Sequence, residues 1–161
     1  MYNFFILNQH IYGGKFMEKE KTEINVLDEL NKGACMGQDA IHFIMDKVEE
    51  KQLKKVLEKQ YKKYNEITDK ISKLYPEYST KKPHETNAMN KAMTWYGIEM
   101  KTMMDDTTSK LAELLMQGTN MGIIEGRRLL NHKHTDEKVN ELVSEYVNMQ
   151  ENAVENLKHF L

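Results

Sequence analysis

A few acidic and histidine side chains stand at spacings that can hold a metal ion. Asp39, His42 and Asp46 fall within two turns of a predicted helix, and the last two have the i, i+4 separation of paired metal ligands. His132 and His134 flank a lysine in a predicted turn, where two imidazoles can capture a metal. The first group lies beside the apolar stripe of its helix, and the second is in a polar segment. We therefore interpret both as solvated side chains and predict no metal site.

Candidates for acid–base or nucleophilic catalysis are also few. Glu125 falls on the predicted apolar stripe of its helix. A buried carboxylate there would need a hydrogen-bonding partner such as Tyr61, Tyr64 or Tyr146, and we interpret that group as a structural network rather than a general base. Cys35 has no histidine within its own helical turn to activate the thiol, so we interpret it as a small buried side chain. The sequence therefore predicts no catalytic residue and no cofactor.

The elements that must position these side chains are helices. The chain has 161 residues and a mass of 19.0 kDa, which suits one domain. Its 8 glycines and 2 prolines are too few for the many turns of an all-β domain, so the predicted class is all-α. The formal charge of -2 argues against a dominant nucleic-acid or anionic-membrane surface.

The cysteine content and the N-terminal segment bear on the compartment. A single cysteine allows no intrachain disulfide, which fits a reducing cytoplasm. Residues 4–7 form the most apolar stretch near the start, and it is far shorter than the roughly 20 residues of a membrane helix. We expect a cytoplasmic protein without a transmembrane segment.

The first residues differ in pattern from the rest of the chain. Residues 1–16 are apolar and aromatic without helical spacing, and Met17 opens a charged run that leads into a helix. Gly13 and Gly14 can be encoded by a ribosome-binding sequence just upstream of Met17, so we hypothesise that translation starts at that methionine. The predicted organisation is a disordered leader over residues 1–22 and one helical domain over residues 23–161.

Four stripes of apolar residues at spacings of three and four predict four long helices. The first begins with an N-cap at Asn25 and ends near residue 50, and the second ends at Pro76. The third carries the stripe from Leu111 to Leu129, and the fourth follows an N-cap at Thr135. Because the connection near residue 50 is short, the first two helices are predicted to form an antiparallel hairpin.

The two hairpins are related by an internal repeat with an offset of 85 residues. Gly33 aligns with Gly118 and Gly37 with Gly122, in a shared Gly-x-x-Met-Gly pattern. A glycine inside a helix costs about 1 kcal/mol relative to alanine. We expect these glycines to let the first and third helices approach closely, in a bundle with pseudo-two-fold symmetry.

Between the hairpins, residues 75–108 are too many for a structureless loop and are predicted to contain a helix. Its large apolar side chains repeat at intervals of four and three: Met89, Met93, Tyr96, Met100 and Met103. Such a methionine stripe can dock a partner or a second copy of the chain. The alternative, which we expect, is that the stripe packs on its own bundle.

Three segments carry a resemblance to a known family. They are residues 31–37 (NKGACMG), 93–100 (MTWYGIEM) and 116–124 (MQGTNMGII). They resemble an uncharacterised bacterial family of the ferritin-like superfamily, and the resemblance extends from Val26 to Leu161. It implies a ferritin-like four-helix bundle in which two antiparallel hairpins are joined by a long helical crossover. It implies no established reaction.

The di-iron chemistry of that superfamily needs a glutamate from each of the first and third helices and a Glu-x-x-His from each of the other two. The family's usual Lys-Gly-Glu motif places a carboxylate where this chain has Ala34 and, in the repeat, Thr119. In place of the Glu-x-x-His motifs stand the pairs Gln60 with Lys63, Tyr61 with Tyr64, Glu145 with Asn148, and Tyr146 with Met149. The sequence therefore predicts that the superfamily's di-iron ligands are absent.

Three functions remain open at this stage. We favour a noncatalytic bundle that acts as a homodimer or through another protein partner. The first alternative is an oxidase or metal-handling protein that binds iron or manganese through displaced ligands. The second alternative is a structural protein of a spore or cell envelope, with the methionine-rich crossover as its binding element. No nucleic-acid partner is predicted.

Overall fold

The chain is all-α, as its composition predicts. The computed structural model describes the backbone of residues 3–85 and 87–161, and the side chains of residues 17–85, 87, 90–95 and 97–161. The α-helices are α1 (Asn3–Met45), α2 (Lys51–Leu74), α3 (Ala88–Thr102), α4 (Thr108–His132) and α5 (Glu137–Leu157). Single-turn 3-10 helices follow α2 and α5, at Tyr75–Glu77 and Lys158–Phe160. Within the described residues there is no strand.

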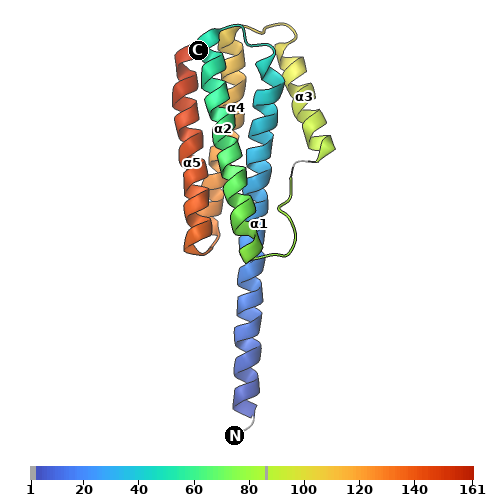
Figure 1. Ribbon diagram of the computed structural model, residues 1–161, viewed down its shortest axis with the longest axis vertical. Coiled ribbons are helices and arrows are strands. Elements are labelled where there is room, and N and C mark those ends of the chain that lie inside the picture. The colour runs from blue at the N-terminus through green and yellow to red at the C-terminus, as the bar shows by residue number, and fades with distance from the viewer. Residues whose placement is uncertain (1–2, 86) are drawn as a thin grey trace.

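Four of the helices, α1, α2, α4 and α5, lie side by side along one direction, and α3 lies against the outside of α1 (Figure 1). The chain runs toward one end of the molecule in α1 and α5 and toward the other end in α2 and α4. The N-terminal part of α1 extends beyond the other helices. The connection after α2 returns along α1 to α3. Because their directions are opposite, α1 with α2 and α4 with α5 form two pairs of antiparallel neighbours.

Side-chain caps set the N-terminal boundaries of α2, α3, α4 and α5. The Glu50 carboxylate caps α2 by accepting a hydrogen bond from the Leu53 amide at 2.6 Å, and α2 ends before Pro76, as predicted. The cap of α5 is Asp136, whose carboxylate accepts from the Val139 amide at 3.2 Å. The predicted cap at Thr135 is therefore wrong by one residue, because Asp136 is the residue with the extended backbone that precedes the first turn.

The first helix begins earlier than its sequence pattern predicts. Asn25, predicted as the N-cap, lies inside α1, which runs without a break from Asn3. The Glu-Lys run after Met17 consists of good helix formers, so nothing local stops the helix there. Glu23, just before Asn25, is 1% exposed, and its carboxylate accepts a hydrogen bond from the Asp136 amide at 2.9 Å. The start of translation at Met17 stays a prediction.

The core lies where the apolar faces of α1, α2, α4 and α5 meet. Its largest fully buried apolar side chains come from all four helices: Val26, Leu27, Leu30, Ile44, Leu53, Leu57, Ile67, Ile71, Leu111 and Val139. Burying one such side chain contributes about 1.5–3 kcal/mol to stability. The predicted apolar stripes of the four long helices are thus the faces that build the core.

The helix α3 turns Met93 and Met100 outward. Met93 is 68% exposed and Met100 is 51% exposed, whereas Ile98 packs against the core and Thr102 is buried. Packing of the methionine stripe on its own bundle is therefore wrong at Met93 and Met100. The reason is that Thr94, Ile98 and Thr102 repeat with the same helical period on another face, so the period alone does not show which face is inward.

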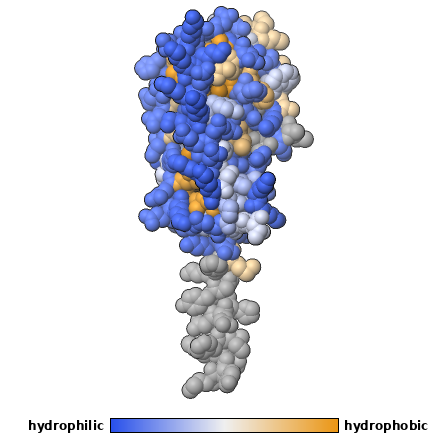
Figure 2. Space-filling view, in the orientation of Figure 1, coloured by the Kyte–Doolittle hydropathy of each residue, from blue (hydrophilic) through white to orange (hydrophobic). Residues whose placement is uncertain are grey.

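Exposed methionines continue into the connection from α3 to α4, where Met103 and Met104 are exposed. Figure 2 shows pale orange atoms at this end of the molecule, on a face that is otherwise mostly hydrophilic. The side chains of Met89 and Tyr96, also in the predicted stripe, lie outside the described residues. We define the methionine surface as Met93, Met100, Met103 and Met104.

Candidate functional site

Two tyrosines and a glutamine form a hydrogen-bonded chain at the centre of the bundle. The Tyr64 hydroxyl donates to Gln150 Oε1 at 2.7 Å, and Gln150 Nε2 donates to the Tyr146 hydroxyl at 2.8 Å. All three side chains are buried. Burial raises the pKa of Tyr64 to about 12, and it also raises the pKa of Tyr146. These three hydrogen-bonded side chains are therefore neutral at physiological pH.

The repeated glycines make room for these side chains. A Cβ added at Gly37 would overlap the ring of Tyr64, and one added at Gly122 would overlap the amide of Gln150. At Gly33 it would lie 2.9 Å from the Tyr146 hydroxyl oxygen. The prediction that the glycines bring two helix backbones together is wrong, because their space is taken by side chains of α2 and α5. At Gly118 an added Cβ would meet nothing within 4 Å, so the repeat is not matched in packing.

Small, buried side chains occupy the two positions at which the family resemblance implies carboxylates. Ala34 is completely buried, and the buried Thr119 donates its hydroxyl to the Leu115 carbonyl at 2.8 Å. Among the side chains that the structure describes, no group of three or more His, Cys, Asp or Glu is arranged to hold a metal.

The residues that stand in place of the Glu-x-x-His motifs lie on α2 and α5. Gln60 donates its Nε2 to the sulfur of Met149 at 2.8 Å, so the two helices meet there through neutral groups. Tyr61 is exposed, and Glu145 is exposed and paired with Lys70. These contacts leave the interior uncharged at this level of the bundle.

The structure separates most of the other residues that the sequence singles out. Glu125 is an exposed side chain paired with Arg128, so its predicted place on the core stripe is wrong. Its neighbour Gly126 is the buried residue, since the buried face of α4 passes from Thr119 to Gly126. Among the tyrosines whose side chains the structure describes, none is therefore a partner of Glu125.

The histidines of both candidate groups are solvated, as predicted from the sequence, whereas the same prediction is wrong for Asp39. His42 and Asp46 are exposed, and so are His132 and His134. Asp39 is half-buried and forms an ion pair with Lys91 of α3 at 3.5 Å, from Nζ to Oδ1. It faces the same space as Cys35, which is half-exposed and lines a cavity rather than filling a contact between two helices.

That cavity has a volume of about 580 Å³ and lies between α1, α2 and the connection that leads to α3. This size falls within the roughly 300–1,000 Å³ typical of small-molecule sites. Its lining is mostly polar and consists of Asn31, Cys35, Gln38 and Asp39 of α1, Asn65, Thr68 and Ser72 of α2, Tyr75, Pro76, Lys81, Lys82, Pro83 and Glu85 of the connection, and Lys91 of α3.

Two side chains of α1 hold the connection over this cavity. Asp28 Oδ1 accepts hydrogen bonds from the Tyr75 hydroxyl and from the His84 amide, both at 2.9 Å. Asn31, which is buried, donates its Nδ2 to the His84 carbonyl at 2.9 Å. The roof of the cavity is thus fixed to α1 by three hydrogen bonds close together.

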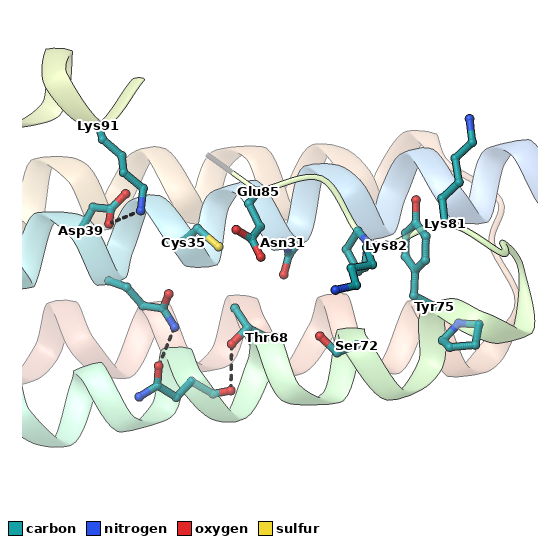
Figure 3. A pocket seen from close by; sticks show the side chains of 14 residues that line it. Asn31, Cys35, Asp39, Thr68, Ser72, Tyr75, Lys81, Lys82, Glu85 and Lys91 are labelled. Atoms are coloured by element: carbon teal, nitrogen blue, oxygen red, sulfur yellow. Dashed lines mark hydrogen bonds and ion pairs between the residues drawn. The ribbon is translucent and has the colours of Figure 1, made fainter. Parts of the chain in front are cut away.

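Hydrogen bonds also order the floor. Gln38 Nε2 donates to Asn65 Oδ1 at 2.7 Å, and the Thr68 hydroxyl donates to the Asn65 carbonyl at 2.9 Å. In Figure 3 the Lys82 side chain extends into the space between α1 and α2, and the Glu85 carboxylate lies close to Asn31 and Cys35. The site therefore offers amides and hydroxyls from its floor and one charge of each sign from its roof.

The cavity is not among the features predicted from the sequence, although the sequence contains a signal for it. Asn65, Thr68 and Ser72 repeat at intervals of three and four on α2, and Asn31, Cys35 and Gln38 do so on α1. Such a stripe of small polar residues beside an apolar stripe indicates a second, polar contact between the helices.

No protein-family profile, curated protein or solved structure matches this chain. None of the described helices combines the length and the apolar run that a membrane span requires. Function must therefore be inferred from the side chains themselves.

Proposed function

We propose that this chain is a noncatalytic ferritin-like bundle that acts by binding a protein surface, in the first place that of a second copy of itself. The arrangement of the helices supports the ferritin-like part of the proposal. α1 with α2 and α4 with α5 form two antiparallel pairs, and the crossover that contains α3 joins them. A bundle with one long crossover connection is the topology of that superfamily.

The observation that carries the noncatalytic part is the neutral chain of Tyr64, Gln150 and Tyr146. It lies against glycines of α1 and α4 that are within one helical turn of Ala34 and Thr119, the two positions at which the family resemblance implies carboxylates. Bound Fe or Mn prefers carboxylate and imidazole ligands, and a site for two ions needs negative charge in the interior. Here the interior offers amide and phenol groups that already bond to each other.

The methionine surface supports the binding part. A soluble chain rarely exposes a large group of apolar side chains unless another surface covers it. Methionine side chains adapt to a partner's shape because they are unbranched and polarisable. A formal charge of only -2 gives two copies of the chain little electrostatic reason to repel each other.

The test is to measure molar mass by light scattering and metal content by elemental analysis on the same purified protein. The proposal predicts a mass of twice 19.0 kDa and no stoichiometric metal. About two iron or manganese ions per chain would contradict it and favour a metal-handling protein. A metal-free monomer that partitions into the envelope fraction would also contradict it and favour the envelope alternative.

A further inference from the structure

We infer that the polar cavity under the connection binds a small zwitterion of the α-amino acid class, with the ligand carboxylate on Lys82 and the ligand ammonium group on Glu85. The inference goes beyond the proposed association of two chains, because the cavity and the methionine surface have no residue in common.

The charges around the cavity point to a zwitterion. Five charged side chains line it, and two of them, Asp39 and Lys91, are paired with each other. The Lys81 side chain points away from the space (Figure 3). Lys82 and Glu85 therefore remain, and within the described residues neither forms an ion pair with the other or with a third group. A ligand that carries one charge of each sign can satisfy both.

Ligands with a single kind of charge fit this lining poorly. A diamine would leave Lys82 beside a cation, and a dicarboxylate would bring a second anion to Glu85. A ligand charge beside a protein charge of the same sign opposes binding, whereas an ion pair with its own hydrogen bonds supports it. The site therefore selects by charge pattern as well as by size.

The floor supplies neutral hydrogen-bonding groups for the rest of the ligand. Asn65 and Thr68 are half-buried and face the space from α2. Asp39 Oδ2 is buried and accepts no hydrogen bond from any described residue. Its ion pair with Lys91 is long, at 3.5 Å, compared with the roughly 2.7–2.9 Å of a strong charge-assisted bond. A ligand with a polar side chain can therefore gain further hydrogen bonds from the floor.

The volume agrees with a small, polar ligand that keeps some water. A cavity of about 580 Å³ accommodates an amino acid together with ordered water, which bridges polar groups nearly as well as direct contact does. The two hydrogen bonds that Asp28 accepts and the one that Asn31 donates hold the roof in place before a ligand arrives. Such preorganisation lowers the entropy cost of binding.

The experiment is a thermal-shift screen of the full chain with each of the twenty common L-amino acids, followed by calorimetric titration of any that raise the melting temperature. Putrescine and glutarate serve as ligands with charge of one sign only. We expect at least one amino acid with a polar side chain to bind, and neither control to do so. Lys82→Met and Glu85→Gln should each weaken binding at least tenfold.

Lys81→Met is the matched control, since it removes the same charge from the neighbouring position while its side chain points outward. It should leave the affinity within twofold of the parent. All three substitutions are at exposed positions, and circular dichroism will check that each variant is folded. The inference is overturned if no amino acid binds, if putrescine or glutarate binds as tightly, or if Lys81→Met weakens binding as much as Lys82→Met. These outcomes are independent of the molar mass, so they are distinguishable from failure of the proposed association.

Discussion

The Tyr64 hydroxyl donates a hydrogen bond to Gln150 Oε1 at 2.7 Å, and this contact joins α2 to α5 through the centre of the bundle. The same glutamine donates to Tyr146, so one amide satisfies two phenols that lie in an otherwise apolar interior. Unpaired polar groups in such surroundings are costly, which makes the three side chains depend on one another.

Gln150→Met should therefore be more destabilising than Tyr64→Phe. The first change removes the partner of both tyrosine hydroxyls, and the second leaves one glutamine oxygen without its donor. Each buried group left unpaired costs about 1–3 kcal/mol. The triple variant Tyr64→Phe, Tyr146→Phe and Gln150→Met removes all three polar groups and should recover part of the loss. Urea denaturation measures these differences, and a triple variant less stable than Gln150→Met alone would contradict the interpretation.

The glycines give a pair of substitutions with opposite expected signs. Gly37→Ala should destabilise the fold by about 1–3 kcal/mol, because the added methyl group overlaps the Tyr64 ring. Gly118→Ala should stabilise it by up to about 1 kcal/mol, because the site is open and alanine has the higher helix propensity. Thermal denaturation of both variants checks this. Equal effects of the same sign would show that the two sites do not differ in packing.

The sequence predicts the helices and the core stripes but not the role of the glycines. Helical period and the stop at Pro76 are local properties, so they can be deduced from spacing. What fills the space over Gly37 depends on a side chain 27 positions later, Tyr64, and on the rotation of α2 about its axis. The repeat is also misleading about packing, since Gly37 and Gly118 belong to the same sequence pattern but have different surroundings.

The buried Glu23 predicts a specific dependence of stability on pH. Burial raises the pKa of this carboxyl above its ordinary value of 4.5, although the Asp136 amide donates a hydrogen bond to it. Between pH 4.5 and the raised pKa the folded protein binds more protons than the unfolded chain, so stability falls as pH rises through that window. Above the window the loss is complete.

Glu23→Gln should remove this dependence, because an amide keeps the acceptor for the Asp136 amide and carries no charge. The melting temperature of the variant relative to the parent should therefore increase from pH 4.5 to pH 8. Glu18→Gln is the matched control, since Glu18 is exposed on the same helix. If the difference in melting temperature between the Glu23 variant and the parent stays constant with pH, the raised pKa of Glu23 is contradicted.

The cavity and the methionine surface show why a site is harder to predict than a fold. Lys82 and Glu85 belong to an irregular connection, and their position over α1 depends on Asp28 and Asn31, more than fifty residues earlier. The stripe of Met93 and Met100 is visible in the sequence, but its outward direction depends on the packing of Ile98. The spacing of residues along the sequence predicts neither the position of the connection over α1 nor the direction of these methionines.

The most direct test of the account is the molar mass, by light scattering, of the double variant Met93→Glu and Met100→Glu beside the parent chain. Because both side chains are exposed on the single chain, the variant should keep the parent's helix content and have a mass of 19.0 kDa, while the parent has twice that mass. Asn148→Glu with Asn152→Glu adds the same charge on exposed positions of α5 and should leave the dimer intact. A parent chain that is already monomeric, or a double variant that unfolds or stays dimeric, would contradict association through the methionine surface.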